Sequence, residues 1–151
     1  MCKWNVLTVA LVLAVATGAA CSESAVSPTS PSSASGSSAV TAERLTGTWR
    51  LTTLQAEGQA LQLVPSNATY DLTFADGRLS TRADCNICNG AFTVSGQTLT
   101  AGPILACTRA ACQTMDFEQA YTRILAGDST AVVSGNTLLL TSPRGRLTFQ
   151  R

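Results

Sequence analysis

Four cysteines near the middle of the chain place the strongest limit on its fold. They form a Cys-x2-Cys pair and a Cys-x4-Cys pair, namely Cys85, Cys88, Cys107 and Cys112. In a cytosolic protein, this spacing would be typical of a tetrathiolate zinc site. In an exported protein, the oxidising surroundings favour disulfides, and redox-active thiols are a third alternative. The compartment of the protein therefore decides how these cysteines are interpreted.

Residues 1–20 have the features of a signal peptide. Lys3 supplies a positive start, and an apolar run follows from Val6 to Ala16. This run is shorter than the roughly 20 apolar residues of a membrane-spanning helix. It ends in small residues before Cys21, which is similar to a bacterial lipobox, although Gly18 stands where a larger aliphatic residue is usual. We expect lipidation of Cys21, with simple cleavage or a signal anchor as alternatives.

A lipid on Cys21 would make the membrane the first partner of this protein. Each buried methylene of an acyl chain contributes about 0.8 kcal/mol, so several chains hold a protein stably. By similarity to lipoprotein sorting rules, Ser22 points to the periplasmic face of the outer membrane, in a cell that has two membranes. Residues 21–42 are rich in Ser, Ala and Pro, which predicts a disordered tether that spans roughly 25 Å.

Residues 43–151 have the length of one domain that can bury its own core. Apart from Lys3, every cation is an arginine, and nine arginines face nine acidic residues. No basic block or stripe occurs, which argues against nucleic acid as a partner. We expect a monomer.

Alternating apolar and polar residues predict short antiparallel strands over most of this domain. Turn signals at Asp76-Gly77, Ser95-Gly96 and Gly135-Asn136 separate them. The residues expected to face inward are Trp49, Leu51 and Thr53; Tyr70, Leu72 and Phe74; Leu79 and Thr81; Phe92, Val94 and Leu99; Ala131, Val133, Leu138 and Leu140; and Leu147 and Phe149.

One segment, residues 115–126, follows a helical period instead. Its apolar positions share one face and should cover the concave side of the sheet; they are Phe117, Ala120, Tyr121, Ile124 and Leu125. Thr114 is a suitable N-cap and Gly127 a suitable left-handed stop. Glu118 suits the positive helix end and is expected to be a surface charge.

Three motifs in this order resemble the META domain family, to which the HslJ-type lipoproteins belong. They are Leu45-Thr46-Gly47-Thr48-Trp49-Arg50-Leu51, Asp84-Cys85-Asn86, and Thr108-Arg109-Ala110-Ala111-Cys112 followed by Glu118-x-x-Tyr121-x-x-x-Leu125. The resemblance covers nearly all of residues 43–151. It implies an α+β fold, a small curved antiparallel sheet that is partly barrel-like, packed against one α-helix. It also implies envelope or stress association without an established enzymatic activity.

Two positions depart from the family pattern. Ala111 stands where the family has methionine, and Cys88 with Cys107 forms an additional pair found in only part of the family. Four cysteines allow three pairings. A strand-turn-strand about Ser95-Gly96 favours the nested one, with Cys88–Cys107 inside Cys85–Cys112, and the outer bridge also fits the family motifs. Each bridge would add roughly 3 kcal/mol of stability by loop entropy.

No catalytic constellation stands out in this chain. It has no histidine, which removes the commonest general base and the usual triads and zinc-hydrolase sites. The acidic residues of the domain show no spacing that selects a catalytic pair. We expect a protein that has no enzymatic activity and binds neither a cofactor nor a metal.

The segment most open to a binding role leads from Gly102 into the loop between Cys107 and Cys112. A cross-linked, protruding loop is preorganised and loses less entropy on binding. Its candidate contact residues are Pro103, Ile104, Leu105, Thr108 and Arg109. A plain structural connector is the alternative. We expect a non-enzymatic envelope lipoprotein that binds an envelope protein or a small ligand; an inhibitor-like module that presents this loop to a protease, or a redox or small-ligand protein, are the alternatives.

Overall fold

The computed structural model describes residues 39–102 and 105–151. Its elements, in chain order, are α1 (Ala42–Leu45), β1 (Gly47–Ala56), β2 (Gln62–Leu63), β3 (Tyr70–Ala75), β4 (Arg78–Ala83), β5 (Asn86–Ser95), β6 (Thr98–Ala101), β7 (Ala106–Cys107), α2 (Met115–Leu125), β8 (Gly127–Ser134), β9 (Thr137–Ser142) and β10 (Gly145–Gln150). Within these residues, neither helix has the length and apolar character needed to cross a membrane.

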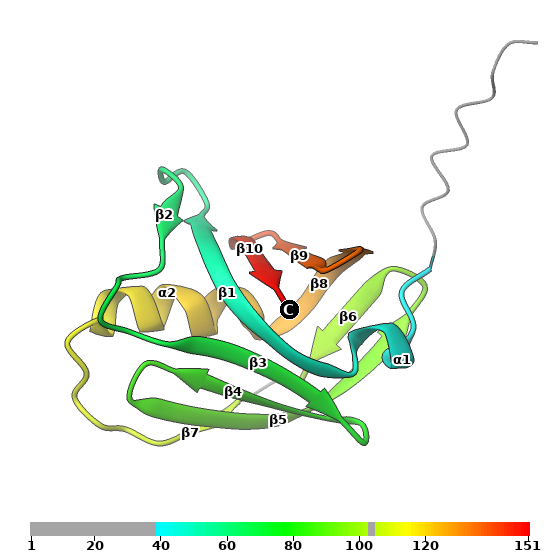
Figure 1. The fold of residues 1–151 in the computed structure, drawn as a ribbon, viewed down its shortest axis with the longest axis horizontal. Coiled ribbons are helices and arrows are strands. Elements are labelled where there is room, and N and C mark those ends of the chain that lie inside the picture. Colours follow the sequence, from blue (N-terminus) through cyan, green and yellow to red (C-terminus); the bar gives the residue numbers. More distant parts are fainter. Residues whose placement is uncertain (1–38, 103–104) are drawn as a thin grey trace, which may run out of the picture. The chain divides into compact units, whose positions relative to one another are not determined.

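Eight of the ten strands form a closed antiparallel barrel (Figure 1). Their order is β1-β3-β4-β5-β6-β8-β9-β10, and β10 pairs back with β1 to complete the ring. The two short strands lie outside the ring, β2 beside β1 and β7 beside β5. The predicted α+β fold with a curved antiparallel sheet and one main helix is therefore confirmed. Closure goes further than the prediction, because it leaves no open edge in the ring itself.

The inward-facing residues of the strands are nearly all as predicted, and β1 contains the exception. Trp49 and Leu51 are buried, but the next buried residue of β1 is Leu54. The register against β10 shifts between Leu51 and Thr53, which marks a β-bulge. The extra residue changes which side chains face the core, so the prediction that Thr53 points inward is wrong.

Helix α2 contributes an aromatic layer to the core. Its buried residues include Phe117, Tyr121, Ile124 and Leu125, as the helical period predicts. The Tyr70 ring lies 4.9 Å from the Phe117 ring and 5.2 Å from the Tyr121 ring, measured between centroids. The helix contacts β1, β4, β9 and β10, so it packs against strands from different parts of the ring.

The ordered domain begins earlier than the sequence pattern indicates. Val40, assigned to the tether, is buried, and its backbone N–H donates to the Gly96 carbonyl at 2.9 Å. Thr41 is the N-cap of α1, and its side chain accepts from the Arg44 N–H. These contacts fix Val40 and Thr41 to the barrel, so the boundary at residue 43 lies about three residues too late.

Candidate functional site

Two disulfides cross-link the middle of the domain. Cys85 is joined to Cys112 and Cys88 to Cys107, which is the nested pairing favoured by the hairpin. Cys88 and Cys107 lie directly opposite each other in the β5–β7 pair, with their Cα atoms 4.0 Å apart. The outer bridge ties the turn between β4 and β5 to the segment just before α2. Both ends of the 108–112 segment are therefore covalently held.

The buried side chain of Asn86 forms hydrogen bonds with this segment. Asn86 is only 1% exposed and begins β5 directly after Cys85. Its Oδ1 accepts from the Ala110 N–H at 2.8 Å and from the Thr108 hydroxyl at 2.9 Å. Its Nδ2 donates to the Ala110 carbonyl at 3.0 Å and also lies 3.2 Å from the Cys112 sulfur. One amide thus binds the backbone of the cross-linked segment in both directions.

Glu118 is the second buried polar residue of this cluster. The sequence pattern predicts it as a surface charge, but it is 9% exposed and this prediction is wrong. Its two carboxylate oxygens lie 2.9 and 3.0 Å from Asn86 Nδ2, which donates to them. Asn86 supplies the donor that a buried carboxylate requires, and only the tertiary fold brings the two residues together.

A chain of hydrogen bonds continues from this cluster along the start of α2. The Thr114 hydroxyl donates to Asp84 Oδ2 at 2.7 Å and lies 2.8 Å from the Tyr70 hydroxyl. Thr114 occupies the predicted N-cap position, but its hydroxyl makes no capping bond and takes part in these two contacts instead. Burial raises the pKa of Tyr70, and the negative charges of Asp84 and Glu118 act in the same direction.

A surface groove runs beside this cluster, between the β2 arm and the start of α2. It consists of two adjoining hollows of about 400 and 360 Å³ that share Cys112 and Gln113. We call it the β2–α2 groove. Its lining residues are Gln62, Leu63, Pro65, Asn67, Asp84, Cys85, Ala111, Cys112, Gln113, Thr114, Met115, Asp116 and Phe117. Disulfide-bonded cysteines thus form part of its wall.

A model of the META domain matches residues 42–151. The chain belongs to the META domain family. The resemblance carried by the three motifs is therefore confirmed, and the last two of these motifs meet in the fold of this META domain. Asn86, Thr108 and Glu118 come from the two motifs and lie in one hydrogen-bonded cluster.

Solved structures support the fold of this META domain. An NMR structure of a protein from Burkholderia xenovorans has a TM-score of 0.60 and 24% identity, covering 73% of this chain and 85% of the other. A second NMR structure has a TM-score of 0.59 and 22% identity, covering 74% of this chain and 94% of the other. No curated protein sequence matches the chain. These likenesses concern the fold alone.

The structure describes the predicted binding loop of this META domain only in part. Pro103 and Ile104 lie outside the described residues, and Leu105 packs partly buried against the core. Thr108 is exposed, but its backbone N–H donates to the Ile87 carbonyl at 3.0 Å, and its hydroxyl accepts from the Ile87 N–H. Arg109 is exposed. Residues 106–108 are therefore anchored to β5, and the sequence did not predict the groove that Ala111, Cys112 and Gln113 line.

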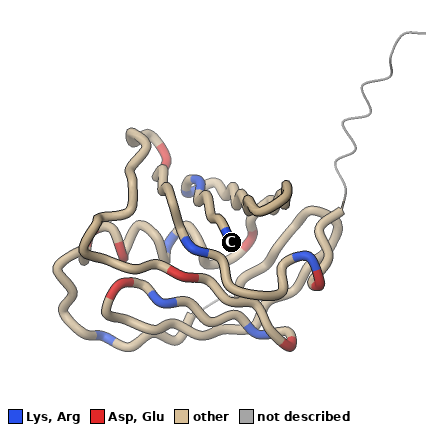
Figure 2. Tube along the Cα trace, in the orientation of Figure 1, with Lys and Arg blue, Asp and Glu red and all other residues tan. Residues whose placement is uncertain are grey.

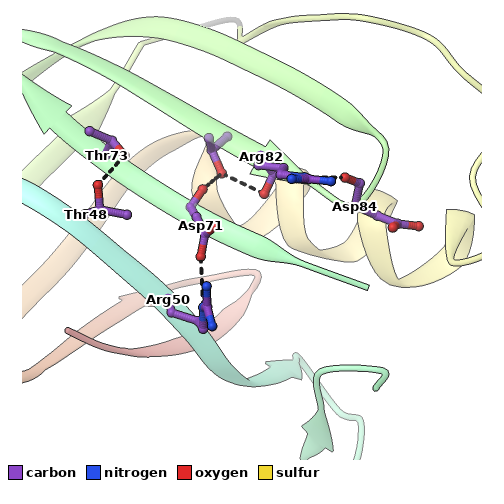
Figure 3. A network of polar contacts seen from close by, with 7 residues as sticks. Thr48, Arg50, Asp71, Thr73, Arg82 and Asp84 are labelled. Atoms are coloured by element: carbon purple, nitrogen blue, oxygen red, sulfur yellow. Dashed lines mark hydrogen bonds and ion pairs between the residues drawn. The ribbon is translucent and has the colours of Figure 1, made fainter. Parts of the chain in front are cut away.

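Polar side chains on the outer surface of β1, β3 and β4 form a separate row (Figure 3). Thr48 bonds to Thr73 across these strands at 2.9 Å, and Arg50 pairs with Asp71 at 3.2 Å. The Arg82 side chain donates to the backbone carbonyl of Asp84, whose carboxylate points away from it. The Arg50 side chain is largely exposed, so its ion pair contributes at most about 1 kcal/mol.

Charges of both signs are spread over the described domain (Figure 2). Across residues 39–102 and 105–151, no group of three or more His, Cys, Asp or Glu side chains is placed to hold a metal ion. Asp84 and Glu118 each bond to neutral side chains of the fold, Thr114 and Asn86. The hydrogen bonds of these two carboxylates thus fix the shape of the surface around the groove.

Proposed function

We propose that this META domain protein is a non-enzymatic lipoprotein of the cell envelope, stress-associated in the manner of the HslJ type, that binds or stabilises a partner. In this proposal, a lipid on Cys21 attaches the protein to the membrane, and the tether carries the domain away from the surface. The periplasmic face of the outer membrane is the proposed location in a cell with two membranes.

The observation that carries this proposal is the pairing of all four domain cysteines. The bridges Cys85–Cys112 and Cys88–Cys107 fall within the described domain. Structural disulfides form and persist in oxidising compartments, which agrees with a signal peptide before Cys21. Both bridges secure the segment that forms one wall of the β2–α2 groove. Rigid cross-linking beside an open groove supports binding, because little conformational entropy is lost there.

A role without catalysis is supported by the chemistry of the side chains. The chain has no histidine. The carboxylate of Glu118 is buried against an amide, and that of Asp84 holds the Thr114 hydroxyl. Both groups are used to fix the fold.

Metabolic labelling with radioactive palmitate tests the lipid anchor directly. The wild-type chain should incorporate label and sediment with membranes, because acyl chains on Cys21 bury many methylenes. Cys21→Ala should lose both the label and the membrane fraction. Cys2→Ala is the matched control, since Cys2 lies outside the small-residue cleavage motif, and it should behave like the wild type. Membrane sedimentation of Cys21→Ala, with unchanged labelling, would contradict the proposal.

A thiol–disulfide role is the second candidate, and one observation favours it. Cys85 is exposed at the groove, whereas its partner Cys112 is buried beside Asn86 Nδ2. An incoming thiolate could attack Cys85 and release the Cys112 thiolate next to this donor. Counting free thiols in freshly isolated native protein separates the two candidates, because the structural role predicts none in the domain. The inhibitor-like alternative has less support, since the 106–108 segment is hydrogen-bonded to β5.

A further inference from the structure

We propose that the β2–α2 groove binds an extended peptide segment that is both apolar and basic, and that this segment pairs with the free edge of β2. The inference rests on the proposed binding function and specifies the chemical class of the partner.

The apolar character of the site comes from side chains on both sides of the groove. Leu63 on β2 is 75% exposed and Met115 at the start of α2 is 40% exposed, and both line the groove. Leu61, next to β2, is 59% exposed. Among the described residues only five large apolar side chains are so exposed, and these are three of them. Exposed apolar side chains that line one groove, as Leu63 and Met115 do, are typical of interaction surfaces.

The backbone of β2 offers hydrogen bonds at the free edge of a strand whose residues Gln62 and Leu63 line the groove. Strand β2 pairs with β1 on one side, and the described chain places no strand on its other side. The Val64 N–H donates to the Thr52 carbonyl of β1 at 3.3 Å. In an antiparallel pair the backbone groups of successive residues point to opposite sides of the strand. The N–H and C=O groups of Leu63 therefore point away from β1. An extended peptide can pair with such an edge and place alternate side chains in the groove.

Charge decides which kind of partner fits. The charged residues that line the groove are Asp84 and Asp116, and no arginine lines it. Asp116 is exposed in the first turn of α2. Two negative charges attract lysine or arginine side chains and repel the anionic headgroups of a bacterial membrane. The groove therefore favours a basic peptide over a lipid surface.

Fluorescence anisotropy with a labelled hexapeptide of alternating lysine and valine tests this proposal. The purified full chain, in detergent micelles, should bind the peptide saturably above a blank of protein-free micelles. The same peptide with glutamate in place of lysine should bind at least about tenfold more weakly, because like charges then meet in the groove. Equal binding of both peptides, or no saturable binding, would overturn the proposal.

Two variants locate the binding site. Leu63→Ser should weaken peptide binding about tenfold, which is about 1.4 kcal/mol, because the serine side chain no longer buries apolar surface against the peptide. Asp116→Asn should weaken it up to about fivefold and reduce its sensitivity to salt. Val132→Ser is the matched control, because Val132 is 43% exposed on β8 and does not line the groove. An equal loss in Val132→Ser would overturn the assignment, and unchanged thermal unfolding midpoints would exclude misfolding.

The alternative occupants give different results. Leu63-dependent binding to phosphatidylcholine vesicles without peptide binding would indicate a lipid surface and overturn the proposal. Leu63-dependent dimerisation in sedimentation, without peptide binding, would indicate a second copy and do the same. Palmitate labelling together with absent peptide binding would remove this inference and leave the proposed function standing. Peptide binding by a chain that carries no lipid would leave the inference standing and remove the proposed anchor.

Discussion

Asn86 connects three parts of the chain that are distant in sequence. Its amide bonds to Thr108 and Ala110, beside the outer disulfide, and to Glu118 on α2. One side-chain amide can bind all three residues because it carries two N–H donors and one acceptor oxygen in the same plane. The shape of the groove wall therefore depends on one buried residue.

We expect Asn86→Ala to destabilise the domain by about 2–3 kcal/mol, because it leaves the buried Glu118 carboxylate and the Ala110 backbone without partners. Urea unfolding followed by tryptophan fluorescence measures this loss. Asn89→Ala is the matched control on the same strand, since Asn89 is exposed, and it should change stability by less than about 0.5 kcal/mol. Similar losses in both variants would contradict the role given to Asn86.

Gly145 shows a second constraint at the scale of one residue. Its φ is 143°, and an added Cβ would lie 2.2 Å from the Gln55 carbonyl oxygen and 2.9 Å from a methyl of Ile124. Only glycine lets β10 approach β1 this closely at the point where the barrel closes.

Gly145→Ala should therefore destabilise the domain by more than about 3 kcal/mol or prevent folding, since backbone strain and a clash with backbone act together. Gly135→Ala is the control, because Gly135 has a positive φ of 56° but open space around its Cβ position. It should cost about 1 kcal/mol. Thermal unfolding by circular dichroism compares the two, and equal midpoints would be inconsistent with the close approach.

The two disulfides are unequal as structural elements. Each cross-links a similar length of chain, with separations of 27 and 19 residues, so loop entropy gives both about 3 kcal/mol. Their surroundings differ more. In the inner bridge Cys88 is fully buried and Cys107 is half-buried, whereas in the outer bridge Cys85 is exposed and Cys112 is buried.

In native conditions, dithiothreitol should therefore reduce Cys85–Cys112 well before Cys88–Cys107, because thiolate attack requires access to a sulfur atom. Alkylation at timed intervals, followed by peptide mass spectrometry, measures the order. Under denaturing conditions both bridges should be reduced at similar rates. Simultaneous reduction in the native state would show that burial does not protect the inner bridge.

At the scale of the whole molecule, the lack of histidine determines the response to pH. No histidine titrates between about pH 6 and 8, so the free energy of unfolding should stay nearly constant there. The two tyrosines respond at higher pH. Burial raises the pKa of Tyr121, although its hydrogen bond with Thr81 acts in the opposite sense, and burial also raises the pKa of Tyr70.

The sign of the alkaline effect follows from these raised values. Above about pH 10 the unfolded chain loses tyrosine protons that the folded domain retains, so stability falls as pH rises. Urea unfolding between pH 8 and 11 should show this decline. Tyr121→Phe should decline less steeply, although it starts about 1 kcal/mol lower because the 2.6 Å hydrogen bond to Thr81 is lost. An identical slope in the variant would contradict the assignment.

The parts of the fold that local patterns predict are the strands, the turns and α2. At Asp76-Gly77 both residues have positive φ, 50° and 71°, as the two-residue hairpin turn requires. The prediction failed where long-range contacts decide the outcome. Thr53 does not face the core because of the bulge against β10. Glu118 is buried because Asn86 supplies a hydrogen-bond donor to its carboxylate.

Residue order predicted the period of most elements and the family and favoured the nested cysteine pairing, since these depend on spacing along the chain, and the structure then showed that pairing. Closure of β10 onto β1, the burial of Glu118 and the groove beside β2 were decided only by the tertiary structure. Each of them joins residues at least 30 positions apart. The free energies of burial and hydrogen bonding at these places arise only when the two distant segments come into contact. A local sequence pattern cannot predict such a contact, because side-chain burial and hydrogen bonding depend on the partner as well as on the residue.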